Sequence, residues 1–367
     1  MSKDMIRLGD VATYVNGYAF KPEDRGNVGL PIIRIQDLTG HAYDLGFYDG
    51  EYPSKIEINN GDILISWSAS LGVYVWDKGK ALLNQHIFKV VFDKVDIDKK
   101  YFVYAVRREL DEMVMKTHGA TMKHIVKKDF DETKIPYPTM EEQIEIAKKL
   151  DKVLCIIQKR KQELELLDDL IKARFVELFG DPRSNPYGFS KKMLRNTCKV
   201  ITGNTPSRSV EEYYGDYVEW IKTDNIVSGL LNPTKASEKL SEEGMRVGRT
   251  VEKDSILMAC IAGSIASIGR VCVTDRPVAF NQQINAVIPA DYNILFLYVL
   301  LQLSKEYLVE EINMALKGIL SKSKLEGKEF IVPPLELQNQ FADFVNQVTK
   351  SKLLEFSSLQ NHTGMLQ

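Results

Sequence analysis

Hydrophobic residues recur at alternating intervals of four and three positions across residues 139–179. The series is Ile146, Leu150, Val153, Ile157, Leu164, Leu167, Ile171 and Leu178, and arginines occupy the two positions that it skips, 160 and 174. This spacing is that of a coiled-coil seam. The stretch contains no glycine or proline, and as one helix it would extend roughly 60 Å. An ordinary amphipathic helix packed on a core is the alternative interpretation.

Both ends of this helix carry local signals. Thr139 and Glu142 have the spacing of a capping box, in which the two residues bond each other's backbone N–H groups. Gly180 and Pro182 are residues that end helices. We therefore expect the helix to begin after Pro138 and to stop at Phe179.

The rest of the chain alternates short apolar runs with turn residues. The runs are rich in Val, Ile, Tyr and Phe, as strands are, and Asn-Gly pairs at 16–17 and 60–61 are typical of turns. A helical pattern returns at 99–116 and near 292–316. The predicted fold class is α+β.

The order of these features occurs twice. ALLNQHI at 81–87 is matched by VAFNQQI at 278–284, and ASLG at 69–72 by ASIG at 266–269. PIIRIQDLTG resembles EWIKTDNIVSG further along, and KIPYPTMEEQ resembles FIVPPLELQ. Such internal similarity indicates two versions of one structural unit.

The repeat divides the chain into four predicted segments. A first unit at 1–138 is followed by the long helix at 139–180, a second unit at 181–334 and a second helix at 335–367. The second helix continues the apolar stripe through Phe341, Phe344 and Val348. Because Ser351 and Glu355 then interrupt the stripe, we expect this helix to be shorter.

Composition excludes several classes of protein. The chain has 367 residues, 44% of them hydrophobic, which is enough for two or three folded domains. There is no apolar run of roughly 18 residues and no apolar core of a signal peptide. The four cysteines are scattered, which favours reduced, mostly buried thiols. We therefore expect a cytoplasmic protein without a membrane segment.

A search for catalytic motifs finds none. There is no phosphate-binding G-x-x-x-x-G-K-[ST] and no G-x-G-x-x-G after a strand, and GSIASIG at 263–269 is interpreted as a strand turn. The five histidines lack metal-ligand spacing. SNPYG at 184–188 and Glu326-x-Lys328 are weak matches to methyltransferase and nuclease motifs. Two similar halves without a reactive group favour a binding protein.

Local charge indicates what is bound, although the net charge is only −2. Residues 116–128 are basic with no acid, and 317–328 repeat the pattern with one glutamate. Residues 182–210 are also basic and acid-free. Basic and small polar residues on glycine loops suit contacts with DNA phosphates. A solvated surface is the alternative for any one run, but its recurrence at the same place favours function.

The Asn-Gln pairs allow two interpretations. Asparagine and glutamine can read adenine edges, and arginine or lysine can read guanine. A buried amide pair can instead brace the fold. Because Asn84-Gln85 and Asn281-Gln282 are the same in both halves, we favour bracing for them. His86 and Gln283, which differ at equivalent places, are better candidates for base contact.

The succession of motifs resembles the specificity subunits of type I restriction-modification systems. The resemblance covers essentially the whole chain. It depends on LGDVATYVNGYAFKP, IIRIQDL, GDILIS, LNQHI, the basic GATMKHI loop, IPYPTMEEQ with its long helix, and LFGDP. The succession is specific, although no single motif is.

This resemblance implies two similar mixed α/β target recognition domains separated by long helices that pack antiparallel, in a pseudo-twofold arrangement. Each domain would read one half of a split site on double-stranded DNA. The helices would set the spacer and bind methyltransferase subunits, and a restriction-translocase subunit would complete the complex. The chain itself would be non-catalytic and bind no metal or cofactor. S-adenosylmethionine, ATP and Mg are expected on the partner subunits.

On this basis the candidate DNA-binding residues come from loops in both halves. They are Lys21, Arg34, Gln36, His86, Lys116, Thr121, Lys123, His124, Lys127, Thr205, Arg208, Lys222, Thr223, Asp224, Gln283, Lys317, Ser321, Lys322 and Lys324. Two other functions are considered: a stand-alone DNA-modification enzyme, which would need the missing cofactor and catalytic motifs, and a structural coiled-coil scaffold, which would not bind DNA.

Overall fold

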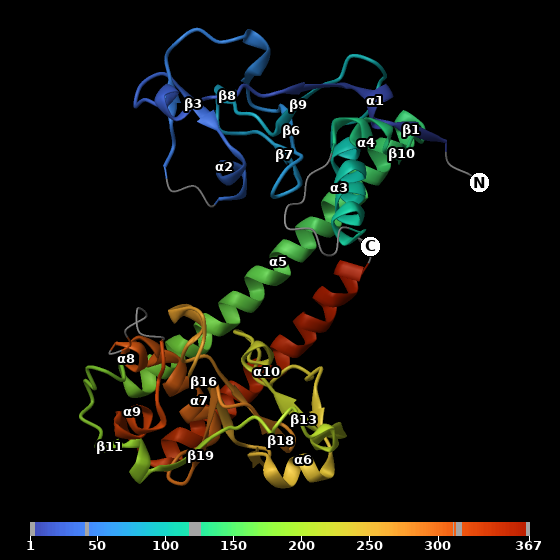
Figure 1. Cartoon of the computed structure of the whole chain (residues 1–367). Coiled ribbons are helices and arrows are strands. Elements are labelled where there is room, and N and C mark those ends of the chain that lie inside the picture. The colour runs from blue at the N-terminus through green and yellow to red at the C-terminus, as the bar shows by residue number, and fades with distance from the viewer. Residues whose placement is uncertain (1–3, 41–43, 117–125, 311, 313–317, 365–367) are drawn as a thin grey trace. The chain divides into compact units, whose positions relative to one another are not determined.

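The computed structural model describes residues 4–40, 44–116, 126–310, 312 and 318–364. The chain separates into two compact units, Met1–Cys155 and Ile156–Gln367, and one long helix, α5 (Met140–Phe179), contributes to both (Figure 1). In the part of the chain that the structure describes, no helix is long and apolar enough to cross a membrane.

The described residues of the first unit form three sheets. A helix-covered sheet has the strand order β2-β9-β6-β7, with antiparallel pairing throughout. A mixed sheet has the order β4-β3-β8-β5, in which β3 and β8 are parallel. Strands β1 and β10 form a third, antiparallel pair. The bounds are β1 Met5–Arg7, β2 Thr13–Asn16, β3 Leu30–Ile33, β4 Phe47–Tyr48, β5 Glu57–Ile58, β6 Ile63–Ser66, β7 Gly72–Val75, β8 Ala81–Leu83, β9 Ile87–Val91 and β10 Lys134–Pro136.

The second unit repeats this topology strand for strand. Its helix-covered sheet has the order β12-β19-β16-β17, its mixed sheet has the order β14-β13-β18-β15 with β13 and β18 parallel, and β11 pairs with β20. The bounds are β11 Lys191–Met193, β12 Cys198–Thr202, β13 Tyr214–Ile221, β14 Lys239–Leu240, β15 Thr250–Val251, β16 Ile256–Ala259, β17 Val271–Val273, β18 Val278–Phe280, β19 Ile284–Pro289 and β20 Glu329–Ile331. The predicted internal repeat and the α+β class are confirmed.

The helices are short except for those that pack on a sheet or follow a proline corner. They are α1 Leu8–Val11, α2 Ile35–Thr39, α3 Lys99–Lys116, α4 Lys127–Glu132, α5, α6 Glu242–Val247, α7 Ile294–Leu303, α8 Lys305–Val309, α9 Lys322–Gly327 and α10 Leu335–Gly364. Single 3₁₀ turns are η1 Pro22–Asp24, η2 Ser54–Ile56, η3 Leu194–Asn196, η4 Glu211–Tyr213, η5 Thr223–Asn225 and η6 Ile265–Ser267. The predicted helix at 99–116 is confirmed.

One central strand of each helix-covered sheet, β6 in the first unit and β16 in the second, is buried on both faces. In β6, Ile63 and Ile65 join a core with α3, whereas Leu64 joins the core of the mixed sheet. In β16, Ile256 and Leu257 divide in the same way. Successive side chains of a strand point to opposite faces, so a strand between two cores is apolar at every position. This explains why these runs are continuous rather than alternating.

The long helix α5 has the ends that the sequence predicts. Thr139 N–H donates to Glu142 Oε2 at 3.0 Å, and Glu142 N–H donates to Thr139 Oγ1 at 3.3 Å, which completes the capping box. Gly180 follows with φ +72°, a left-handed conformation that favours glycine. The helix therefore stops where the chain can turn without strain.

In the second unit, α5 packs on a core as well as on another helix. Phe175 and Phe179 are fully buried, and their rings contact Phe296 of α7 and Phe341 of α10. Leu178, the last residue of the predicted seam, is half-buried at the edge of this cluster. The seam therefore gives way to a broader apolar face where α5 meets the recognition domain.

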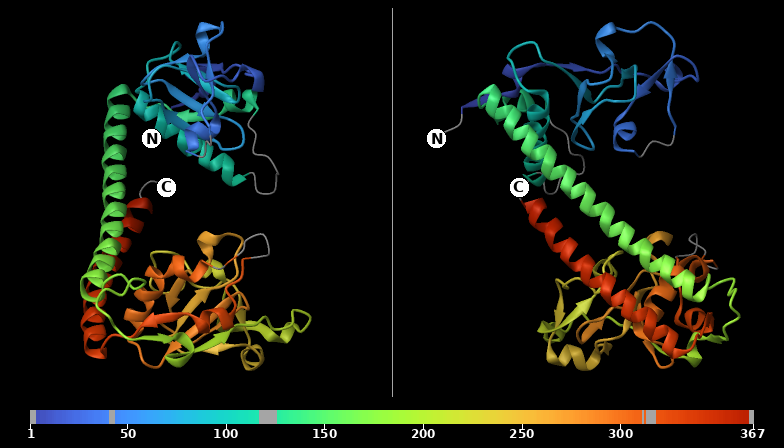
Figure 2. Two further views of the ribbon diagram at one scale, coloured as in Figure 1. Left: turned by 90° about the vertical axis from the view of Figure 1, so that its left-hand side faces the viewer. Right: turned by 180° about the vertical axis from the view of Figure 1, so that it is seen from behind.

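Helix α10 lies antiparallel to the C-terminal part of α5 (Figure 2). Asp168 bonds Lys352 at 2.6 Å, and the guanidinium of Arg174 lies 5.9 Å from the ring centre of Phe344, so the partner number falls as the α5 number rises. Helix α10 has 30 described residues against 40 in α5, and it continues through Ser351 and Glu355, the residues that interrupt the apolar stripe. All these contacts lie within the second unit.

Candidate nucleic-acid interface

Four segments meet at one end of the second recognition domain. The N–H of Asn281 donates to Ile221 O at 3.0 Å, and the N–H of Cys260 donates to Gln283 O at 2.8 Å. Leu320 N–H donates to Cys260 O at 2.9 Å. These bonds bring together the turn after β13, the Asn-Gln turn, the end of β16 and the start of the second basic loop. The fold thus brings together segments that carry candidates distant in sequence, among them Lys222, Gln283 and Ser321.

The first domain makes the corresponding bonds. Asn84 N–H donates to Ile33 O at 3.0 Å, and Trp67 N–H donates to His86 O at 3.3 Å. The matching basic loop falls outside the described residues, and with it the candidates Thr121, Lys123 and His124, as does Lys317 in the second half. Lys116 is the last residue of α3.

The asparagine of each Asn-Gln pair bonds within its own turn beside a crossing of two backbones, whereas Gln85 and Gln282 are exposed. Asn84 Oδ1 accepts from Gln85 N–H at 2.8 Å, and Asn281 Oδ1 accepts from Gln283 N–H at 3.1 Å. A Cβ added at Gly17 would lie only 2.0 Å from Asn84 O, and one at Gly203 2.1 Å from Asn281 O. Glycine is therefore required by close approach in both halves. Asn16-Gly17 is wrong as a predicted turn, because it ends β2 beside this crossing.

His86 occupies a constrained position at the end of the first domain. It has φ +72°, and its ring lies 4.9 Å from that of Trp67. Trp67 stacks on Phe88 at 5.6 Å, and Lys127 Nζ lies 5.5 Å from the centre of the Phe88 ring. Among the described residues, His86 Nδ1 has no hydrogen-bond partner. The structure thus brings the candidates His86 and Lys127 to one aromatic cluster.

Arg34 and Lys222 begin equivalent turns, as the sequence alignment of the halves predicts. Arg34 N–H donates to Asp37 Oδ2 at 2.8 Å, and Lys222 N–H donates to Asn225 Oδ1 at 3.0 Å. The Arg34 side chain is buried and its guanidinium bonds Asp37 and Asp44. Its assignment to base contact stays a prediction, and this geometry favours bracing. Gln36, two residues on, is exposed.

A charged cluster lies on the second domain. Glu238 forms ion pairs with Arg208, at 2.8 Å, and with Lys222. The guanidinium of Arg208 lies 5.2 Å from the ring centre of Tyr214, and Lys222 Nζ lies 5.2 Å from that of Trp220. Hydrogen bonds from Lys222 and Arg208 hold the pKa of the Glu238 carboxyl below its usual value. We name Arg208, Lys222 and Glu238 the charged triad.

The remaining candidates differ in accessibility. Lys21, Asp224, Lys322 and Lys324 are exposed, and Thr205 is exposed while its hydroxyl donates to Gln282 Oε1. Thr223 O accepts from Arg270 at 3.1 Å. Ser321 caps α9, with its Oγ accepting from Lys324 N–H at 3.3 Å.

Sequence analysis did not name four residues that lie beside the candidates: Trp67 beside His86, the buried Trp220 and Glu238 beside Lys222, and Arg270 beside Thr223. Glu238 and Arg270 carry no local signal, because only folding brings them beside Lys222 and Thr223. The two tryptophans could have been found from composition, since the chain has only three and aromatic residues are common partners of cations.

The two similar halves of the chain both match one known protein family. A family model described as the type I restriction modification DNA specificity domain matches residues 2–166 and again 186–360. These matches cover most of the chain. The chain belongs to this specificity family. The match confirms the resemblance given by the motifs and the prediction of a specificity protein rather than a catalytic one.

Individual members of the specificity family are similar along nearly the whole chain. The EcoBI specificity subunit of Escherichia coli is 24% identical over 376 residues, which cover 94% of this chain and 78% of that subunit. The MjaVIII specificity subunit of Methanocaldococcus jannaschii is 24% identical over 94% of this chain and 85% of its own length. A solved S subunit from M. genitalium covers 100% of this chain with a TM-score of 0.58 and 15% identity, which shows a shared fold.

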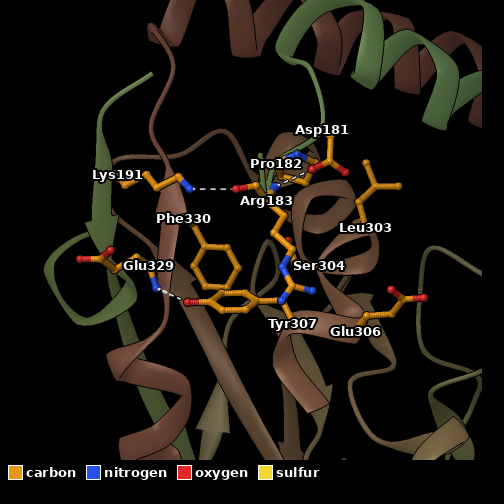
Figure 3. Close-up of a pocket in the computed structure, with 10 residues that line it drawn as sticks. All are labelled: Asp181, Pro182, Arg183, Lys191, Leu303, Ser304, Glu306, Tyr307, Glu329 and Phe330. Atoms are coloured by element: carbon orange, nitrogen blue, oxygen red, sulfur yellow. Dashed lines mark hydrogen bonds between the residues drawn. The ribbon is translucent and has the colours of Figure 1, made fainter. Parts of the chain in front are cut away.

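One further feature of this family member is a cavity in the second unit. The cavity, of about 180 Å³, opens beside the turn after α5 (Figure 3), and Lys191 Nζ donates there to Arg183 O at 3.0 Å. Acidic and basic side chains both line it, so its charge selects no ligand class. Its lining residues are Asp181, Pro182, Arg183, Lys191, Leu303, Ser304, Glu306, Tyr307, Glu329 and Phe330.

The cysteines are thiols in the structure. Cys198, Cys260 and Cys272 are buried, Cys155 is exposed, and none of the four forms a disulfide. Burial raises the pKa of the Cys260 thiol to about 12, so it is protonated at neutral pH. Among the described residues, no group of three or more His, Cys, Asp or Glu is placed to hold a metal ion.

Proposed function

We propose that this chain reads a two-part target on double-stranded DNA and holds methyltransferase and restriction-translocase subunits on that target. Each recognition domain reads one half of the target, and the long helices set the gap between the halves. The chain binds no cofactor, and S-adenosylmethionine, ATP and Mg belong to the partner subunits.

The observation that supports a two-part target is the presence of equivalent turns in both recognition domains. Both domains join the same turns by equivalent bonds, Asn84 to Ile33 and Asn281 to Ile221, yet they present different side chains there. His86 is replaced by Gln283 at the equivalent turn. One framework with different polar groups suits two domains that read different bases.

The outer face of α5 supports the docking of partner subunits. Leu166 and Leu170 are 59% and 47% exposed, and with the exposed Ala173 they lie on the face opposite the packed residues Ile171 and Phe175. An apolar stripe on the solvent side of a helix is typical of a surface that another protein covers. We propose that this stripe contacts a methyltransferase subunit.

An exchange of one recognition domain tests the two-part target. Residues 194–328 are replaced by the equivalent segment of another specificity subunit, and the methylated motif is sequenced in cells that carry the complete system. Leu194 N–H donates to Lys328 O at 2.9 Å, so both junctions lie at one place and the β11–β20 pair comes from one parent. We expect one half of the motif to change.

The first domain offers the matched exchange. Leu8 N–H donates to Thr133 O at 2.8 Å, so residues 8–133 can be exchanged at equivalent junctions. This variant should change only the other half of the motif. If either exchange altered both halves, or neither, the two domains would not read the target independently.

A further inference from the structure

A buried glutamine stands in the first turns of α5. Gln143 is 1% exposed. Its Nε2 donates to Pro138 O at 2.9 Å, and its Oε1 accepts from Asp98 N–H at 2.9 Å. Pro138 is the corner between β10 and α5, and Asp98 is the residue before α3. One side chain therefore ties the sheet corner, the packing helix and the long helix together.

The second unit contains the same joint. Gln338 of α10 is 0% exposed, its Nε2 donates to Pro333 O at 2.8 Å, and its Oε1 accepts from Asn293 N–H at 2.9 Å. Each glutamine bonds a proline carbonyl 5 residues before it and an N–H group 45 residues before it. Both spacings are the same in the two halves, although other long-range spacings, such as Leu8 to Thr133 and Leu194 to Lys328, differ.

The two hydrogen bonds of each glutamine fix the direction of its helix as well as the position of the helix. A planar amide whose donor and acceptor ends are both bonded inside a core has one favourable orientation. The helix that carries it is then held at one angle to its own recognition domain. Apolar packing alone is non-directional and allows small rotations of the helix.

We propose that Gln143 is a positioning residue that selects the spacer of the DNA target, because it fixes the angle between α5 and the first recognition domain. Gln338 has the same role at α10. This inference rests on the proposed two-part reading of DNA. In this role neither glutamine contacts DNA, and each acts through the helix that it orients.

The orientation of α5 should depend more strongly on Gln143 than the orientation of α10 depends on Gln338. The start of α10 is also held by Phe341, which is buried against Phe175 and Phe179. The equivalent residue of α5, Ile146, has a smaller side chain that is only half-buried against the first core. Asp151, further along α5, bonds Tyr104. The first unit therefore depends more on its glutamine than the second does.

Gln143→Met tests the role with a side chain of similar size that makes neither bond. The assembled methyltransferase complex is assayed on duplexes whose spacers are one base pair shorter than, equal to, or longer than the natural one. We expect the preference for the natural spacer to fall at least about fivefold, the lower end of coupling between two sites. Gln338→Met should lower it less.

Two further variants separate positioning from folding. Gln158→Met makes the same chemical change at an exposed position of α5 and should leave the spacer preference unchanged. Gln143→Glu keeps the acceptor for Asp98 N–H but loses the donor to Pro138 O, and should give an intermediate preference.

The inference is overturned if Gln143→Met keeps the natural spacer preference. It is also overturned if Gln143→Met and Gln143→Glu both lose methylation at every spacer and both lose a cooperative thermal unfolding transition. The amide would then be required for folding and not for orienting the helix. Failure of the proposed function is a separate result, since the unaltered complex would then methylate a target without two separated halves.

Discussion

At the scale of single residues, the chemical type of the candidates could be predicted but their partners could not. Arg34 has the right chemistry to read guanine, yet its side chain is buried against Asp37 and Asp44. Arg208 and Lys222 are more accessible, but both bond Glu238 in the free protein. A carboxylate that holds two cations occupies the bonds that a DNA phosphate would otherwise take.

Glu238→Gln should strengthen binding to DNA of any sequence. The substitution removes the negative charge that neutralises Arg208 and Lys222, so both become available to phosphates. The salt dependence of binding should steepen by up to about 2, since each phosphate contact adds about 0.9 to the slope. Binding to an unrelated duplex at several salt concentrations measures both effects.

Asp216→Asn is the matched control in the same domain. Its side chain is 96% exposed and lies 3.5 Å from Lys239, outside the charged triad. This variant makes the same change in net charge, so its slope reports the general electrostatic effect alone. If the two variants gave the same slope, Glu238 would not restrain Arg208 and Lys222.

At the scale of elements, the polar residue that interrupts the apolar seam of α5 pairs with the one that interrupts the stripe of α10. Arg160 occupies a seam position of α5, and Glu355 interrupts the stripe of α10. The structure places Arg160 Nη1 2.6 Å from Glu355 Oε2, with both side chains half-buried. A polar pair inside an apolar seam fixes the register of two helices, because any shift would bury one charge without the other.

Arg160→Leu should destabilise the helix pair, and adding Glu355→Leu should restore it. The single change leaves a half-buried carboxylate without this partner, at a cost of about 1 kcal/mol for a pair that water still reaches. The double variant completes the apolar seam instead. Thermal unfolding of both variants measures the difference.

Lys161→Leu provides the comparison at the neighbouring position, which is exposed. It should change the unfolding temperature little. Equal destabilisation by the single and double variants would show that Arg160 and Glu355 do not act as a pair.

At the scale of the whole molecule, the boundary between the two units falls within α5, which contributes to both. Four residues inserted after Lys159 would lengthen it by about 6 Å and turn the following part by about 40° beyond one full turn. The contacts of Arg160, Asp168 and Arg174 with α10 lie beyond the insertion. At about 3.4 Å per base pair, the unspecified gap in the methylated motif should grow by one or two bases.

Sequencing of the methylated motif reads this outcome directly. Both half-sequences should be retained, because neither recognition domain is altered. An alanine substitution at Lys159 serves as the control and should keep the original gap. The original gap in the insertion variant would mean that α5 does not set the distance between the half-sites.

Much of the architecture follows from signals close together in the chain. The capping box at Thr139, the four-three spacing and Gly180 determine where α5 begins and ends. The recurrence of Asn84-Gln85 indicates two equivalent units and their bracing turns. These features need no knowledge of distant residues, since helix capping, helical periodicity and tight turns are decided within a few positions.

Tertiary structure decided which side chains meet. Glu238 reaches Arg208 and Lys222 across 30 and 16 residues, Phe175 joins the rings of α7 and α10, and Gln143 finds Asp98 at a separation of 45. No local pattern contains these contacts. They exist because strand pairing and core packing bring separate segments together, and buried polar groups then bond whichever partners the fold supplies.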